Sequence, residues 1–203
     1  HDCRHQHWID DSLVIKQFSD WANCHKSHRI SLVPDWWDYK HNADVKTQYG
    51  TAEQTLTCSL APADVGLANN LARQSTEVDN STDRFVDALV VLKIKSGVSS
   101  LATGFVNIYA FGSAGGTTRT EGAGATDAAI TLTVPPNAPL IGRLNVVVNA
   151  VTYVGGPFSV AAGFGGILPQ KWGIIIENKS GDSLDTTESN HAKLWQGVYY
   201  TSI

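Results

Sequence analysis

The run from Pro157 to Asn178 (PFSVAAGFGGILPQKWGIIIEN) is the most apolar and least charged stretch of the chain, so any fold must bury it. Within the run, Trp172, Ile174 and Ile176 lie on one side of a period-2 alternation, which is typical of a strand with one buried face. The other face is also nearly apolar, so we predict a central strand. The preceding segment from Val160 to Leu168 also fits a buried helix, because short apolar runs do not separate helix from strand.

From Val45 onward the sequence is typical of an all-β domain. Short runs rich in Thr, Val, Ile, Gly and Ala are separated by turn residues at intervals of about ten. The expected strands cover residues 54–60, 85–95, 105–111, 129–134, 140–148, 152–160, 172–177 and 193–200. Such short strands without long helices predict an antiparallel β-sandwich, most simply jelly-roll-like, over residues 44–203.

The period-2 placement also predicts which side chains form the core of this domain. The expected core residues are Phe105, Ile108, Tyr109, Leu132, Phe158, Trp172, Ile174 and Ile176. Cys58 alternates inward with Leu56, so we expect a small buried hydrophobe there and not a nucleophile. Residues 112–127 contain no large apolar side chain, and we therefore expect an exposed loop that cannot hold itself rigid.

Residues 1–43 differ in composition from the rest and are predicted to form an irregular N-terminal arm. They hold six of the seven histidines, four of the six tryptophans and two of the three cysteines, with no glycine. No periodic apolar face within the arm can hide its tryptophans. We therefore expect Trp36, Trp37 and Tyr39 to dock against the β-domain or a neighbouring subunit.

Two Cys/His clusters in the arm form a weak metal-ligand pattern, because their spacing does not correspond to a recognisable zinc finger. Thiolates and imidazoles are the ligands of tetrahedral zinc, so a zinc site is one interpretation and a Cys3–Cys24 disulfide is another. A third is that these side chains share no task. The weak zinc candidates are Cys3, His5, His7, Cys24, His25 and His28.

Composition bounds the partners that the chain can have. The net charge is −4 and Lys and Arg are not clustered, which argues against nucleic-acid binding. No run approaches the ~20 apolar residues of a membrane span, and no signal-peptide order is visible at the N-terminus. Only 17% of residues are charged, which is typical of surfaces covered by neighbours. We therefore expect a homo-oligomer, with a trimer as the first expectation.

The predicted domain offers little catalytic chemistry, and we expect no enzymatic activity and no cofactor. Its single histidine, His191, falls in a polar loop and is expected to be solvent-exposed. A metal between Glu188 and His191, a calcium at Asp182 and Asp185, and a glycosidase carboxylate pair are weaker alternatives. The carboxylates considered for such a pair are Asp79, Asp83, Asp87, Glu177 and Asp185.

Aromatic side chains suggest one binding alternative. Trp195 alternates with Leu194 on the last predicted strand, and with Tyr199 it could form a platform for a sugar ring. Core packing of Trp195 is the other interpretation.

The order of segments from residue 43 to the end resembles small structural proteins of tailed bacteriophage virions. The similarity lies in FVNIYAFGS, a Gly/Thr loop, DAAITLTVPPNAPLIG, GGPFSVAAGFGGILPQKWGIIIENKSG and a closing KLWQGVYYT. Members of that group begin at a methionine just before a segment like Ala43–Gly50. Here Asn42 stands at that position and the chain has no methionine at all, so residues 1–42 are either an extension or upstream sequence read through as protein.

The resemblance implies a non-enzymatic virion component, made in the host cytoplasm and assembling on the head as a decoration protein or on the tail. Its partners would be further copies of itself and other virion proteins. The alternative function on the same fold is a carbohydrate-binding or host-receptor adhesin module, because a fold does not decide function.

Overall fold

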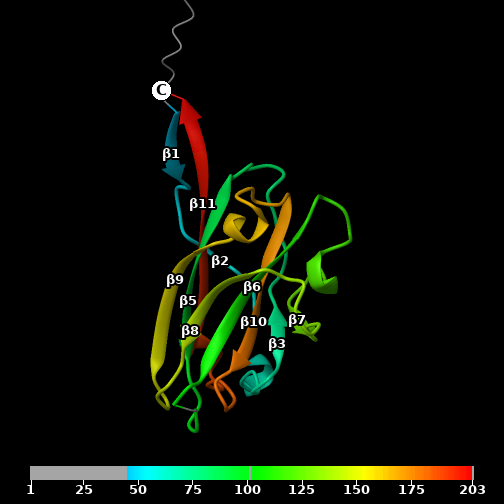
Figure 1. Ribbon diagram of the computed structural model, residues 1–203. Coiled ribbons are helices and arrows are strands. Elements are labelled where there is room, and N and C mark those ends of the chain that lie inside the picture. Colours follow the sequence, from blue (N-terminus) through cyan, green and yellow to red (C-terminus); the bar gives the residue numbers. More distant parts are fainter. Residues whose placement is uncertain (1–44, 101, 203) are drawn as a thin grey trace, which may run out of the picture. The chain divides into compact units, whose positions relative to one another are not determined.

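The computed structural model describes residues 45–100 and 102–202, which form two antiparallel β-sheets packed face to face (Figure 1). Sheet A has the order β1 (Val45–Tyr49), β11 (Ala192–Ser202), β5 (Asp87–Lys95) and β9 (Thr152–Ser159), and β2 (Gln54–Thr55) also pairs with β11. Sheet B has the order β7 (Ala128–Ile130), β3 (Ala72–Gln74), β10 (Lys171–Lys179), β6 (Phe105–Ser113) and β8 (Leu140–Asn145), with β4 (Val78–Asp79) against β10. The predicted antiparallel, jelly-roll-like sandwich is confirmed.

Four short 3₁₀ helices connect the strands. They are η1 (Pro62–Asp64), η2 (Thr120–Gly122), η3 (Ala161–Phe164) and η4 (Glu188–Asn190). The helix considered for Val160–Leu168 is therefore a single tight turn, which ends at Gly165 in the left-handed region with φ 74°. That conformation favours glycine because it lacks a Cβ.

The apolar run predicted to be central does lie at the middle of sheet B. β10 pairs with β6 on one side and with β3 and β4 on the other, so its backbone is hydrogen-bonded along both edges. Trp172, Ile174 and Ile176 point into the space between the sheets and are fully buried. Ile175 points the other way and is also fully buried. A strand covered on both faces explains why this run is so apolar.

Two apolar clusters result from this arrangement. The main core lies between the sheets and includes Val90, Leu92 and Ile94 of β5 opposite the inward residues of β6 and β10. A second, smaller cluster lies on the outer face of sheet B around Phe111 and Ile175.

The segment between β6 and β8 covers this second cluster, so the prediction that residues 112–127 form an exposed, non-rigid loop is wrong in part. Ala123 is buried in the cluster although its neighbours are exposed. Gln74 of β3 accepts a hydrogen bond from Gly124 N (2.9 Å) and donates one to Thr126 O (2.7 Å). Arg119 forms an ion pair with Glu77, and both side chains are largely buried. Polar anchors therefore hold a stretch that has little apolar surface of its own.

Of the eight predicted core residues, five are buried and three lie at the margin. Phe158 packs against the main core and Leu132 against the second cluster, and both remain partly exposed. Phe105 begins β6, where the guanidinium of Arg143 lies 4.1 Å from its ring centroid. A period-2 pattern thus identified the right faces but not where each strand leaves the core.

Most strand boundaries agree with the sequence pattern to within a few residues, but the strand predicted over residues 54–60 does not. Only Gln54–Thr55 pair with β11, although Leu56, Cys58 and Leu60 are all buried as the alternation requires. The alternation reports burial, while a strand also needs a partner for its backbone hydrogen bonds.

An aromatic stack on sheet A depends on Gly197. The Phe85 ring lies edge-on to Trp195 (centroids 6.0 Å apart) and tilted to Tyr199 (6.2 Å). A Cβ on Gly197 would stand 2.5 Å from three ring atoms of Phe85, so glycine is needed where this ring crosses β11.

Gly197→Ala should therefore lower the free energy of unfolding by about 1–3 kcal/mol, as expected for overpacking of a core. Gly116→Ala is the matched control, because a Cβ there meets nothing within 4 Å. Thermal and urea unfolding of both variants provides the measurement. Equal stability of the two variants would contradict the role assigned to Gly197.

Candidate functional site

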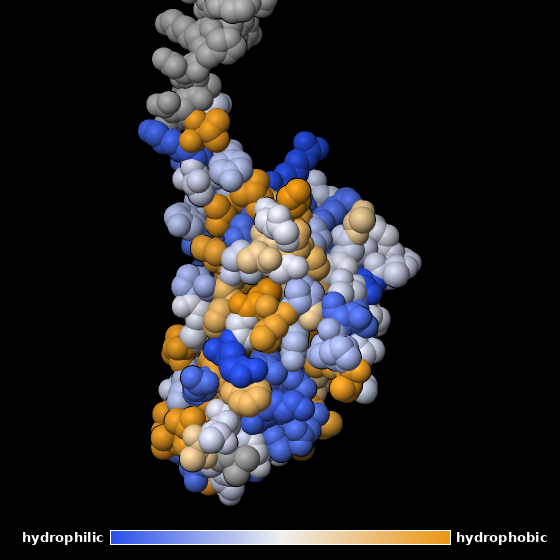
Figure 2. Space-filling view, viewed as in Figure 1, coloured by the Kyte–Doolittle hydropathy of each residue, from blue (hydrophilic) through white to orange (hydrophobic). Residues whose placement is uncertain are grey.

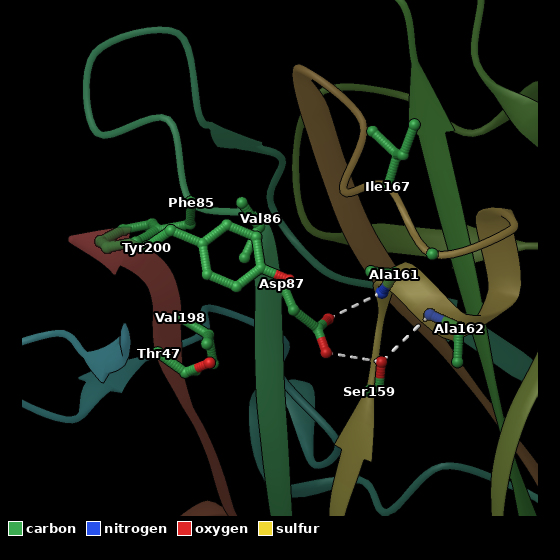
Figure 3. A pocket seen from close by; sticks show the side chains of 11 residues that line it. Thr47, Phe85, Val86, Asp87, Ser159, Ala161, Ala162, Ile167, Val198 and Tyr200 are labelled. Atoms are coloured by element: carbon green, nitrogen blue, oxygen red, sulfur yellow. Dashed lines mark hydrogen bonds between the residues drawn. The ribbon is translucent and has the colours of Figure 1, made fainter. Parts of the chain in front are cut away.

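A groove of about 570 Å³ opens at one end of sheet A (Figure 3). Thr47, Val198 and Tyr200 of the β1–β11 ribbon form one wall. Ala162 and Ile167, in and after η3, form the wall opposite (Figure 3). The ribbon extends beyond the body of the sandwich, and the turn containing η3 faces it (Figure 1).

Among the described residues that line this groove, Asp87 at the start of β5 is the charged one. Its Oδ1 accepts hydrogen bonds from Ala161 N (2.8 Å) and Ala88 N (2.7 Å), and its Oδ2 accepts one from Ser159 Oγ (2.6 Å). Ser159 Oγ in turn accepts one from Ala162 N (3.0 Å). Asp87 and Ser159 therefore anchor the η3 turn to the sheet.

The rest of the groove is mainly apolar and accessible. Ile167 is 75% exposed and Tyr200 63% exposed, while Val198 of β11, which also lines the groove, is buried. Large apolar side chains held out of the core by a folded backbone are typical of contact surfaces. This arrangement can bind apolar and aromatic groups of a partner.

The glycan platform predicted at Trp195 and Tyr199 is only partly compatible with this geometry. Trp195 is 4% exposed and lies edge-on to Trp172 at 5.1 Å, so the prediction of a sugar contact at Trp195 is wrong and the core interpretation holds. Tyr199 is half-buried against Phe85. The accessible tyrosines of the ribbon are Tyr49 and Tyr200.

A second candidate, the polar cluster around His191, lies at the other end of β11. His191 was expected to be solvent-exposed, but it is buried. Its Nε2 lies 2.9 Å from Asp185 O, and its Nδ1 accepts a hydrogen bond from Lys95 N (3.3 Å). With the Nδ1 lone pair engaged, Nε2 carries the proton and donates, so the ring is neutral.

The charged neighbours of His191 are paired with one another. Lys95 Nζ lies 2.8 Å from Asp185 Oδ2, and this ion pair lowers the pKa of the Asp185 carboxyl below its usual range. Lys193 is buried and pairs with Glu188, whose other oxygen accepts a hydrogen bond from Ala61 N (2.7 Å). The cluster holds the η4 turn and the end of β5 together.

The carboxylates considered for glycoside hydrolysis are likewise engaged in local contacts. Glu177 accepts hydrogen bonds from Asn107 Nδ2 (2.9 Å) and Tyr109 Oη (3.1 Å) and pairs with Lys179 (3.0 Å). Hydrophilic residues gather on the lower part of the face shown in Figure 2. Asp79 accepts a bond from Ser81 N (2.8 Å), while Asp83 is exposed in the turn that follows.

Of the predicted metal sites, the calcium site at Asp182 and Asp185 lies within the described residues and the zinc site of the arm lies outside them. Asp182 accepts hydrogen bonds from Ser99 N (2.7 Å) and Ser183 N (2.8 Å), while Asp185 is paired with Lys95. Within 45–100 and 102–202, no group of three or more His, Cys, Asp or Glu residues has a metal-binding arrangement. The weak zinc candidates Cys3, His5, His7, Cys24, His25 and His28 lie outside the described residues, as do Trp36, Trp37 and Tyr39, which were predicted to dock.

Cys58 is buried as predicted, and burial raises the pKa of its thiol to about 12. At neutral pH the side chain is an uncharged thiol that packs with Leu56 and Leu60 in the main core.

The chain matches no protein-family model and has no significant match among curated proteins. None of the helices in the described part of the chain is long and apolar enough to cross a membrane.

The buried, neutral His191 makes the stability of the fold depend on pH. Burial lowers the pKa of His191 below its ordinary value of about 6.5 in an unfolded chain. Between these two pKa values the unfolded state binds more protons, so this contribution to stability is complete above about pH 6.5 and is lost as the pH falls. Its slope in that window is at most about 1.4 kcal/mol per pH unit.

Urea unfolding at pH 7.5, 6.5 and 5.5 compares the full chain with His191→Gln. We expect the wild type to lose stability relative to the variant as the pH falls, because the other histidines contribute equally to both chains. Parallel pH profiles for the two proteins would contradict the assignment of a neutral His191.

Proposed function

We propose that the protein is a non-enzymatic structural component of a bacteriophage virion, which assembles on the head as a decoration protein or on the tail. The observation that carries this proposal is the apolar groove between the β1–β11 ribbon and the η3 turn, where Ile167 and Tyr200 are held exposed by ordered backbone. Such a surface binds another protein through burial of apolar area. The resemblance of residues 43–203 to small virion proteins indicates where that partner would be found.

The hydrogen bonds around Asp87 support the same role. A contact surface has to keep its shape before the partner arrives, because ordering a loop on binding reduces affinity. Asp87 and Ser159 accept backbone N–H groups from both Ala161 and Ala162, which fixes the turn that carries Ile167. The groove wall is therefore preorganised.

A second candidate function is binding of a host glycan, and it rests on the two exposed tyrosines of the ribbon. Tyr49 is opposite Val198 and Tyr200 is opposite Thr47, so both rings lie on the same face of the two-stranded ribbon. Aromatic rings on one face can stack on sugar rings. Loss of binding on a glycan array in Tyr200→Ala, with binding by the wild type, would favour this alternative.

The virion role predicts that the chain is present in purified particles at a fixed copy number. Mass spectrometry of gradient-purified particles encoded by the same genome tests this directly. Ile167→Glu should reduce incorporation at least tenfold, since it places a charge on the apolar wall of the groove. Val65→Glu is the matched control, because Val65 is 65% exposed but does not line the groove.

Absence of the chain from particles that are otherwise complete would overturn the proposed function. Equal incorporation of Ile167→Glu and the wild type would show that the groove is not the contact.

A further inference from the structure

The outer face of sheet A carries a small group of apolar side chains between the charged residues Asp87 and Lys93 of β5. The group consists of the partly exposed Leu89 and Val91 of β5, Val154 of β9 and Leu194 of β11, with the buried Val198 of β11 at its end beside the groove. We call this surface the outer A face. Val154 is 68% exposed although it lies in the middle of a strand.

The outer face of sheet B, in contrast, is covered by another segment of the chain. There the apolar residues Phe111 and Ile175 are covered by the segment between β6 and β8. An apolar sheet face normally requires a second layer, since burial of its side chains is what stabilises a sandwich. The apolar side chains of the outer A face are therefore typical of a surface that binds another protein.

Two opposite charges lie at the two ends of this face on the same strand. Asp87 begins β5 and Lys93 is three positions further along the outward-facing series, so the two side chains are separated by about 20 Å. Within the described residues Lys93 takes part in no ion pair. Asp87 accepts three hydrogen bonds, which leaves one of about four acceptor sites of its carboxylate for a cation.

We propose that a second copy of the chain packs on the outer A face in a two-fold symmetric dimer. With the two-fold axis in the plane of the face and perpendicular to the strands, β5 of one copy runs antiparallel over β5 of the other. Leu89 then meets Val91 of the second copy, and Asp87 meets Lys93 at both ends. The same relation brings Leu194 against Gln196, because these residues pair with Val91 and Leu89.

The positions of Asp87 and Lys93 favour a second copy of the chain over a different protein as the partner. A two-fold contact places every residue of the patch against the same patch, so an acidic end and a basic end match only if the strands run in opposite directions. The three-fold assembly expected from composition has no such requirement. The charge pattern of β5 therefore favours a dimer over the trimer.

The area available beside β5 fits a weak contact. Three strands (β9, β5 and β11) about 4.8 Å apart and eight residues of about 3.3 Å rise give a face of about 14 by 26 Å, or about 750 Å² over the two copies. Interfaces below about 1,000 Å² are typical of weak or transient association, so we expect the dimer at high protein concentration. Sheets that pack face to face are a common and regular solution, with their strands turned by about 30°.

This inference deepens the assembly role proposed above by naming a surface and a symmetry, and it is tested without particles. Sedimentation and native mass spectrometry of the full chain, over a concentration series, should show a dimer. Val154→Glu should raise the dissociation constant at least tenfold. Val98→Glu is the matched control, because Val98 is 76% exposed in a turn away from the face and should leave the dimer intact.

A second pair of variants tests the charge match independently. Lys93→Glu sets like charges opposite each other at both ends of the interface and should also weaken the dimer at least tenfold. Lys46→Glu makes the same change of net charge on β1, on the side of the strand opposite Thr47, and should have no effect. Circular dichroism and thermal melts confirm folding of each variant. If Val154→Glu fails to fold, Lys93→Glu decides.

Three results would overturn the dimer. These are a monomer at every concentration, a trimer, or a dimer that both Val154→Glu and Lys93→Glu leave unchanged. A dimer with the expected variant behaviour but without incorporation into particles would support this inference and overturn the virion role, so the two proposals fail separately.

Discussion

The contact between Trp172 and Trp195 fixes how the two sheets face each other. Trp172 lies on β10 in the middle of sheet B, and Trp195 lies on β11, which is paired along both edges in sheet A. Their rings meet edge to face, 5.1 Å apart at 86°, and both are buried. Such pairs contribute about 0.5–1.5 kcal/mol beyond the area they bury. Because side chains alternate along a strand, placing these two rings inward decides the direction of every other side chain on both strands.

With these side chains directed inward, each sheet also has an outer face. The outer faces of the two sheets differ in how far other parts of the chain cover them. On sheet B it sends the segment between β6 and β8 across Phe111 and Ile175 and anchors it with the Arg119–Glu77 ion pair. On sheet A the outward residues of β5 and β11 include Leu89, Val91 and Leu194, which are partly exposed. This difference between the two outer faces is the reason for placing the proposed contact on sheet A.

Titratable side chains that suggested chemistry in the sequence take structural roles in the fold. Lys193 points toward the interior of the sandwich, and its charge is matched by Glu188 of the η4 turn. His191 is held neutral between two backbone groups. Burying a charge or a polar group costs free energy unless it is paired, so these contacts determine how the loop between β10 and β11 must fold.

The sequence was sufficient to predict the sandwich because its strongest signal, two-faced burial of residues 172–177, follows directly from strand geometry. It was insufficient for His191, since polar neighbours such as Ser189 and Asn190 suggest an exposed loop. In the structure the ring is buried and accepts a hydrogen bond from Lys95 N, distant in the chain. The sequence was also insufficient for the groove. Tyr200, Ile167 and Asp87 lie far apart in sequence, and only the pairing of β5 with β9 and β11 brings them together.

The groove and the outer A face meet at Asp87, so the proposed dimer determines where its two grooves would lie. Val198 and Asp87 form the end row of the face and also line the groove, whereas Tyr200 and Thr47 lie about 7 Å further along the ribbon. In the proposed dimer, with the two β5 strands antiparallel, the groove would lie opposite the end of the second copy's β5 and not opposite its centre. In the proposed dimer each groove would therefore lie at the rim of the interface, with one groove at each end. Two grooves on one dimer would allow it to engage repeated sites, because the second contact would form at a high effective concentration.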